Sequence, residues 1–137
     1  MRAHQEEKGQ SIVEMAFLLP ILVLLLVVVV DAARAFDAYI VLTNATREGA
    51  RYGSFVGQDS SVTVAAVQQV VVDDVQGSGT NLTRMEDFSA SNVAVDGLFI
   101  TSTAVTVTAT YDFDLYFGGI VGLDTFHLQK QAVMPVY

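Results

Sequence analysis

The stretch "GQSIVEMAFLLPILVLLLVVVV", residues 9–30, decides the fold of this chain. Within it, Met15 to Val30 carries no charge and a single proline, Pro20. An acid, Glu14, stands directly before this apolar run. A helix needs roughly 20 apolar residues to cross a bilayer, so residues 11–30 predict a membrane-spanning helix with a carboxylate near its edge. A carboxylate at the lipid boundary is unfavourable unless it has a partner.

The composition limits the classes of protein that fit. The 137 residues suggest one domain, or one domain with an anchor, and 52% of them are hydrophobic, which is high for a soluble domain. Removing the first 30 residues leaves about 107, enough for an independent core. The net charge of −8 argues against a nucleic-acid binder and against a polybasic membrane-surface protein. The absence of cysteine excludes disulfides, cysteine-ligated zinc and thiol catalysis.

Two interpretations of the N-terminal segment use common features. A secretory signal peptide would take its basic region from Arg2 and Lys8 and its cleavage site from residues 33–35, Ala-Arg-Ala. Its apolar region would be longer than usual, and Asp31 and Arg34 would crowd the site. An uncleaved membrane anchor would instead have to tolerate the exposed carboxylate near the interface.

A third interpretation explains both Gly9 and Glu14. A cut after Gly9 would make the amino group of Gln10 the new N-terminus and Glu14 the fifth residue of the mature chain. In a helical assembly, the Glu14 carboxylate of one subunit would meet the Gln10 ammonium of its neighbour, and each charge would offset the desolvation of the other. These features resemble the type IV prepilin class, with a short charged leader before the cut. Met15 stands where short major pilins of that class usually carry an aromatic residue, which points to an accessory pilin.

The helical pattern continues beyond the apolar run. Residues 31–54 contain no proline and are rich in alanine, and Gly53 and Gly57 are candidate stops. One helix over residues 10–53 would reach about 66 Å. The amphipathic face of this continuation is predicted from a three-to-four spacing at Phe36, Ile40, Thr43, Arg47, Ala50 and Ser54. The expected organisation is a leader at 1–9, a membrane or filament-core helix at 10–30, an amphipathic continuation at 31–57 and a head domain at 58–137.

The segment "NATREGARY" carries a second resemblance. Its residues are Asn44, Ala45, Thr46, Arg47, Glu48, Gly49, Ala50, Arg51 and Tyr52. The segment is similar to the one that follows the apolar helix in TadE-like pilus-assembly proteins, and with the N-terminal features it covers about the first 55 residues. Gly49, Ala50 and Gly53 make a face without bulk, which allows a sheet or helix to approach closely.

The polar residues of this segment have two interpretations. Glu48 can pair with Arg51 three residues later, and Asn44 can reach Glu48. They form either an ordinary solvated helix face or a functional one. The functional face would be a contact between subunits or a clamp on an acidic segment such as Asp73-Asp74.

The remainder predicts an α+β head. Asp59 or Ser60 is expected to cap a short second helix that ends at Gly77 or Gly79. One face of this helix is predicted at Val62, Ala65, Ala66, Gln69, Val70 and Asp73. Residues 78–92 are polar and loop-like, and residues 98–103 are expected to precede or join the first strand. Residues 104–117 and 124–137 alternate as half-buried antiparallel strands around a turn at 118–122, with Pro135 permitted on an edge strand.

No constellation for catalysis or metal binding emerges from the sequence. His127 is the one histidine beyond the leader, so a zinc cluster is not expected. Asp112 with Asp114, and Asp73 with Asp74, are expected to be solvated charges because no calcium loop accompanies them. The glycosylation sequons at Asn44 and Asn81 are short patterns of low specificity, so no glycan is predicted from them. An enzyme, a cofactor and a metal are therefore not expected.

The two resemblances imply a pilin-like fold: a long helix, a short second helix and a small antiparallel sheet. They imply a minor pilin or pseudopilin of a tight-adherence pilus. The partners would be a prepilin peptidase, other pilin subunits, an inner-membrane assembly platform with its ATPase, and membrane lipid. The expected location is the cytoplasmic membrane or a surface pilus, with the N-terminus cytoplasmic and the head outside. The alternatives are a single-pass membrane-anchored extracytoplasmic binding or sensor domain and a secreted hydrolase.

Overall fold

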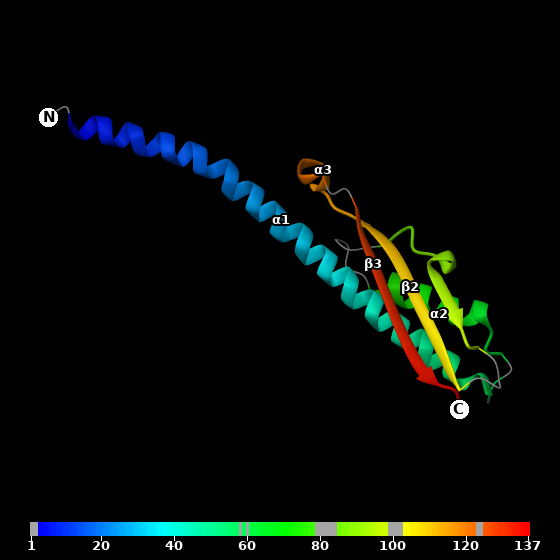
Figure 1. Cartoon of the computed structure of the whole chain (residues 1–137). Coiled ribbons are helices and arrows are strands. Elements are labelled where there is room, and N and C mark those ends of the chain that lie inside the picture. The colour runs from blue at the N-terminus through cyan, green and yellow to red at the C-terminus, as the bar shows by residue number, and fades with distance from the viewer. Residues whose placement is uncertain (1–2, 58, 60, 79–84, 99–102, 123–124) are drawn as a thin grey trace.

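A single long helix carries a small α+β head at its C-terminal end (Figure 1). The computed structural model describes residues 3–57, 59, 61–78, 85–98, 103–122 and 125–137. Their elements are α1 (Ala3–Gly53), the 3₁₀ turn η1 (Ser54–Gly57), α2 (Val64–Ser78), the 3₁₀ turn η2 (Ala90–Asn92), β1 (Val93–Asp96), β2 (Ala104–Asp114), α3 (Gly118–Val121) and β3 (Thr125–Pro135). The α+β class expected from the sequence is confirmed.

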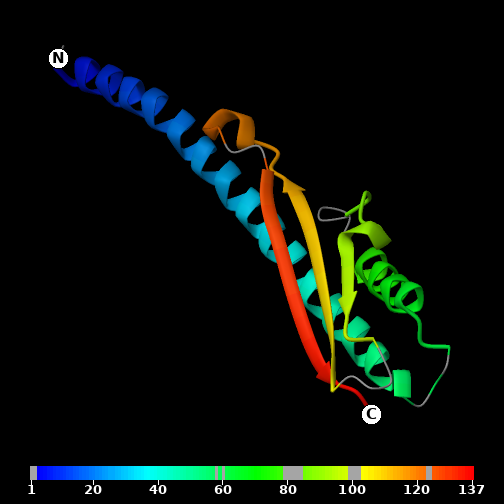
Figure 2. The ribbon, with the colours of Figure 1, turned by 45° about the vertical axis from the view of Figure 1, so that its right-hand side comes forward.

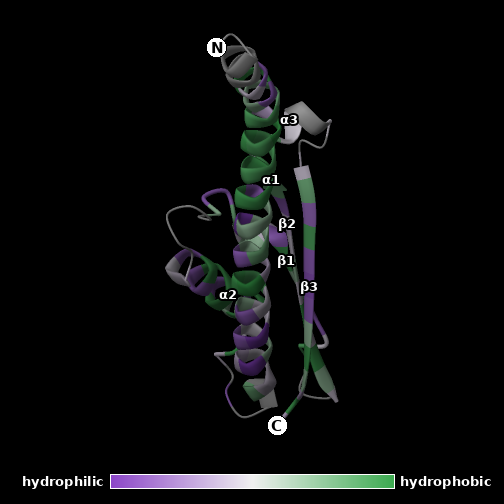
Figure 3. Ribbon diagram, turned by 90° about the vertical axis from the view of Figure 1, so that its left-hand side faces the viewer, coloured by the Kyte–Doolittle hydropathy of each residue, from purple (hydrophilic) through white to green (hydrophobic). Residues whose placement is uncertain are grey.

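The N-terminal half of α1 projects away from the head (Figures 1 and 2). With 51 residues, α1 is about 77 Å long. Pro20 lies inside it, and the helix continues on both sides of the missing amide. The large apolar side chains from Ile12 to Val30 are exposed except Val27, which is half-buried, and Figure 3 shows hydrophobic turns along this run after more hydrophilic turns at the N-terminal end of α1. Its surface therefore requires a covering that the head does not provide.

The sheet is antiparallel with the strand order β1-β2-β3. In the register of β2 with β3, Val107 lies opposite Ala132 and Tyr111 lies opposite Leu128. The predicted alternation is confirmed, because β2 buries Val105, Val107, Ala109 and Phe113 and turns its threonines to the outer face. Pro135 ends the edge strand β3, where its lack of an N–H is tolerated.

Strand β1 was not predicted from the sequence. It has only four residues, which is too short for an alternating pattern to stand out. It pairs with β2 from Val93 opposite Ala109 to Asp96 opposite Thr106. Gly97 follows with φ +74°, a conformation that favours glycine. The expected strand residues 99–102 lie outside the described residues.

One face of the sheet is covered by α1 and α2, and the core lies between these two layers (Figure 2). α2 buries Val67, Val71, Val72 and Val75. The face predicted by spacing is therefore not the buried one: Ala65, Gln69 and Asp73 are exposed, Ala66 and Val70 are half-buried, and the buried Val62 precedes the helix. The loop-like segment before β1 is also part of the core, since Met85 and Phe88 are buried and Phe88 packs on Tyr111.

The start of α2 differs from the expected one. The helix begins at Val64, and the Thr63 hydroxyl oxygen accepts a hydrogen bond from the Ala66 N–H at 3.2 Å. Thr63 is therefore the cap. Asp59 accepts the Ser61 N–H at 2.8 Å in the preceding turn, which lowers the pKa of its carboxyl. Ser60 lies outside the described residues.

The amphipathic face predicted for α1 was right only at its C-terminal end, where Ala50 and Ser54 are buried. Phe36, Ile40 and Arg47 are exposed, whereas the residues that pack into the head are mostly small. The fully buried ones include Ala38, Leu42, Ala45 and Ala50. Small side chains are needed because two layers cross this face closely. The predicted face without bulk is thereby confirmed.

The C-terminus returns to the end of α1. The Tyr137 N–H donates to the Ser54 carbonyl at 2.8 Å, and the Val136 N–H donates to the Thr103 carbonyl at 3.2 Å. The ring of Tyr137 lies 6.4 Å from that of Phe55. These contacts close the head at the end that is farther from the projecting half of α1 (Figure 1).

Candidate functional site

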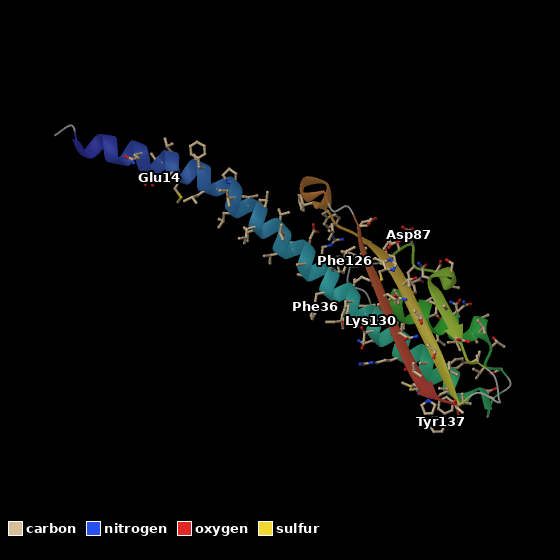
Figure 4. The ribbon with its side chains drawn as sticks, viewed as in Figure 1. Glu14, Phe36, Asp87, Phe126, Lys130 and Tyr137 are labelled. Atoms are coloured by element: carbon tan, nitrogen blue, oxygen red, sulfur yellow. The ribbon has the colours of Figure 1, made fainter. Side chains whose placement is uncertain are left out.

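The expected processing and assembly residues lie on the projecting half of α1. The backbone of Gly9 and Gln10 is part of the helix, which runs through the expected cut without a break. Gln10 and Glu14 are exposed. Figure 4 shows Glu14 far along the helix from the head. Its carboxylate therefore faces surroundings that the head does not form.

The stalk segment "NATREGARY" divides into two faces. Ala45, Gly49 and Ala50 are buried against the head. A Cβ placed on Gly49 would lie 2.3 Å from a methyl carbon of Val71 in α2 and 3.6 Å from one of Val107 in β2. Gly49 thus marks the place where α2 crosses α1, and even one added methyl group requires a shift there.

The charged residues and Asn44 of the same segment lie away from the core, whereas Thr46 is buried with its hydroxyl donating to the Leu42 carbonyl at 2.9 Å, and Tyr52 packs partly against the core. Asn44, Arg47 and Arg51 are exposed, and Glu48 and Tyr52 are half-buried. The guanidinium of Arg51 donates two hydrogen bonds to the Glu48 carboxylate, one of them from Nε at 2.9 Å. This bonding lowers the pKa of Glu48 and raises the pKa of Arg51. The predicted pairing of these two residues is confirmed.

The acidic segment considered as a target of these arginines makes a local contact instead. Asp73 accepts a hydrogen bond from the Gln69 side chain at 2.8 Å within α2. Arg51 is likewise engaged within its own helix. The stripe of Asn44, Arg47 and Arg51 therefore remains accessible on the outer side of the stalk.

A further site, which sequence analysis missed, lies where the apolar run ends. Asp31 is only 6% exposed. Its carboxylate accepts the backbone N–H of Tyr116 at 3.2 Å and that of Phe117 at 3.1 Å, and it binds Nη1 of Arg34 at 3.1 Å. We call Asp31, Arg34 and the two amides the junction clasp. It fastens the tip of the sheet to α1 at the first residue after the apolar run.

Arg34 extends the clasp by stacking. Its guanidinium carbon lies 3.5 Å from the ring centroid of Tyr116 and 4.9 Å from that of Phe113. A guanidinium above aromatic faces is favourable, more so when it is partly desolvated. The signal that could have found this site is an Asp and an Arg three residues apart directly after an apolar run, since such charges need partners near lipid.

Two further contacts join polar side chains of different elements. On β3, Lys130 hydrogen-bonds the hydroxyl of Tyr39 on α1 and lies 3.8 Å from the centroid of its ring. Nδ1 of His127 lies 2.6 Å from the carboxylate of Asp112 on the neighbouring strand, and both side chains are exposed. Within the described residues, no three His, Cys, Asp or Glu side chains gather as metal ligands would.

Comparison with protein families agrees with this geometry. Residues 9–51 match the model of the TadE-like protein family. The match spans the expected cut, Glu14, the apolar run, the junction clasp residues of α1 and most of the stalk segment, and it confirms the predicted resemblance. No curated protein and no solved structure matches the chain. Among the described residues, one helix, from Gln10 to Gly53, is long and apolar enough to cross a membrane.

Proposed function

We propose that this chain is a pilin-like subunit, a minor pilin or pseudopilin, that is inserted in a membrane by residues 10–30 and takes part in assembly of a tight-adherence type IV-like pilus. The observation that carries the proposal is the division of α1. The TadE-like match covers one helix whose apolar half is exposed and whose other half is built into the core of the head.

In the proposed pathway, a prepilin peptidase cuts after Gly9 and releases the Gln10 amine. Glu14 of the mature chain then pairs with the amine of a neighbouring pilin subunit. The pairing suits a carboxylate that is exposed on an apolar helix, since lipid or a filament core would otherwise leave it desolvated and alone. An assembly platform and its ATPase would extract the subunit from the membrane.

The outer stripe of the stalk is the second proposed contact. Asn44, Arg47 and Arg51 are exposed on a helix whose other face is fully used by the head. In a filament this stripe would face the neighbouring subunit. The head carries most of the acidic residues of a chain with net charge −8, and Arg51 is paired with Glu48, so Arg47 is the residue of the stripe that offers complementary charge to the next head.

The proposed topology places the N-terminus in the cytoplasm. Arg2 and Lys8 precede the span, whereas the flank beyond it is mixed, with Asp31, Arg34 and Asp37. Positive charge tends to stay on the cytoplasmic side. Added protease should therefore digest the head in spheroplasts, and protection of the head until lysis would contradict this orientation.

The test of the proposal is the mass of the intact protein isolated from its own cells. A chain that starts at Gln10 is expected, and Gly9→Ala should leave the precursor uncut because the peptidase would lose its glycine. A functioning assembly whose subunits retain residues 1–9 would contradict the proposal. That result would favour the alternative, a single-pass anchored binding or sensor domain, which needs no cleavage.

A further inference from the structure

An apolar groove lies between α1 and the tip of the sheet. It has a volume of about 580 Å³, and its walls come from residues 28–39 of α1 and, on the head, from Leu115, Phe117, Gly118, Phe126 and Leu128. Val28, Ala35, Leu115 and Leu128 are among the lining residues. The one charged residue in the lining is Asp31, and its carboxylate is already engaged by the junction clasp.

Exposed aromatic side chains gather around this groove. Phe36 is 63% exposed and Phe126 is 54% exposed, and Tyr39, Tyr116 and Phe117 are also exposed. Figure 4 shows Phe126 at the tip of β3, near the projecting half of α1, and Tyr137 at the opposite end of the sheet. Among the described residues of the head, the other exposed aromatic rings are Phe55 and Tyr137, which contact each other at that opposite end.

The position of the groove indicates what covers it. Val28 belongs both to the groove and to the exposed apolar run that ends at Val30. If lipid covers that run, the groove opens at the boundary between acyl chains and head groups. Aromatic side chains are enriched at that depth in membrane proteins. Because the chain is acidic, an anionic membrane surface attracts it little. The burial of apolar side chains is therefore the contribution that can hold the tip at the bilayer.

The size of the groove favours a thin occupant. A helix is about 10 Å wide, so about 580 Å³ would seat roughly 7 Å of one, little more than a single turn. A helix from a neighbouring subunit would therefore make most of its contacts outside the groove. A flexible acyl chain can follow the groove from the lipid side, where Val28 lines its entrance.

We propose that the tip of the head is a membrane-contact site, in which a phospholipid acyl chain fills the groove and Phe36, Phe117 and Phe126 lie at the lipid interface. The inference rests on the membrane insertion proposed above. The junction clasp fixes the head against the end of the span, so the tip reaches the bilayer without a separate anchor. A subunit that leaves the membrane to enter a filament would then have to lose this contact between the groove and the acyl chain.

The experiment uses the absence of tryptophan from the chain. The full chain is reconstituted in vesicles of phosphatidylcholine with brominated acyl chains, which quench indole emission only on contact. Three variants are compared: Phe126→Trp at the tip, Tyr137→Trp at the opposite end of the head, and Leu22→Trp inside the apolar run. Phe36→Trp repeats the tip measurement if Phe126→Trp unfolds.

The proposal predicts that Phe126→Trp loses most of its emission, with the strongest quenching by bromines placed close to the head group, and that Tyr137→Trp keeps its emission. Quenching of Leu22→Trp reports insertion independently. If Leu22→Trp is quenched and the tip variants are not, insertion stands and the lipid contact is refuted. A third outcome would also refute the lipid contact: the brominated lipid does not quench the tip tryptophan, and this side chain becomes shielded from water only when more protein is packed into each vesicle. That outcome would show that a second copy of the chain occupies the groove. If Leu22→Trp is also unquenched, insertion and the lipid contact both fail.

Discussion

The two halves of α1 have the same backbone and opposite surroundings. From Met15 to Val30 the side chains are uncharged and mostly large and apolar, and nearly all of them are exposed. From Asp31 to Gly53 the inward side chains are mostly small and are buried under a sheet and a second helix. The comparison teaches that side-chain size and the location of polar partners, more than hydropathy, determine which part of this helix belongs to the head.

The largest effect on the head is expected from breaking the junction clasp. Asp31→Ala would leave the Tyr116 and Phe117 amides without their side-chain acceptor and would remove the buried Asp31–Arg34 ion pair. Loss of one partner of a buried ion pair costs about 3 kcal/mol or more. Thermal unfolding of the full chain in detergent should show this loss, and Asp31→Asn, which keeps one acceptor oxygen, should lose less. An unchanged melting temperature for Asp31→Ala would mean that the clasp does not hold the head to the stalk.

A smaller loss is expected from crowding the crossing of α1 and α2. Gly49→Ala would place a methyl group 2.3 Å from a methyl carbon of Val71. Overpacking a core costs about 1–3 kcal/mol, which exceeds the gain of up to about 1 kcal/mol from replacing glycine in a helix. Gly77→Ala is the matched control, because Gly77 lies in α2 and a Cβ there has nothing within 4 Å. Equal effects of Gly49→Ala and Gly77→Ala on stability would contradict the claim that α1 and α2 cross too closely at Gly49 to accept a methyl group.

The smallest effect is expected on the outer face of the stalk. The pKa of Glu48 is lowered by its hydrogen bonds from Arg51, so the pair stabilises the head above the unfolded-state pKa, near 4.5, and this contribution is lost as the pH falls through the lowered pKa. The side chains of Arg51 and Glu48 are 59% and 41% exposed, so solvent weakens their attraction, and Glu48→Gln should cost less than about 1 kcal/mol at neutral pH and about nothing at acidic pH. Unfolding curves of the two proteins at neutral and acidic pH measure the difference. A large loss that persists at low pH would show that Glu48 acts in packing and not through its charge.

The parts that sequence could predict are those with long regular patterns. The apolar run, the continuation of α1, and strands β2 and β3 each extend over many residues, so their periods are clear. The inward face of α1 was misassigned because apolar spacing selected Phe36 and Ile40. The packing instead demands small residues such as Ala45 and Gly49.

The spacing of Asp31 and Arg34 after the apolar run could have indicated the helix side of the junction clasp, but its partners on the head, and β1, could not be derived from local pattern. Asp31 meets the amides of Tyr116 and Phe117, which lie 85 and 86 residues later, and backbone donors leave no trace in side-chain chemistry. β1 is a four-residue strand whose existence depends on pairing with β2. The assembly residues Gly9 and Glu14 came from spacing before an apolar run, and their role stays a prediction.

The most direct test of the division of α1 is a paired measurement on Glu14→Leu. The account predicts that the head melts as in the parent protein, because Glu14 is exposed on the projecting half, away from the core. It also predicts that much less of the variant is incorporated into sheared surface filaments. The Gln10 ammonium of the neighbouring subunit would lose its partner, and leaving one member of a buried ion pair without its partner costs about 3–5 kcal/mol. Normal incorporation of Glu14→Leu, with an unchanged head, would contradict the central claim that the projecting half of α1 carries the assembly contact.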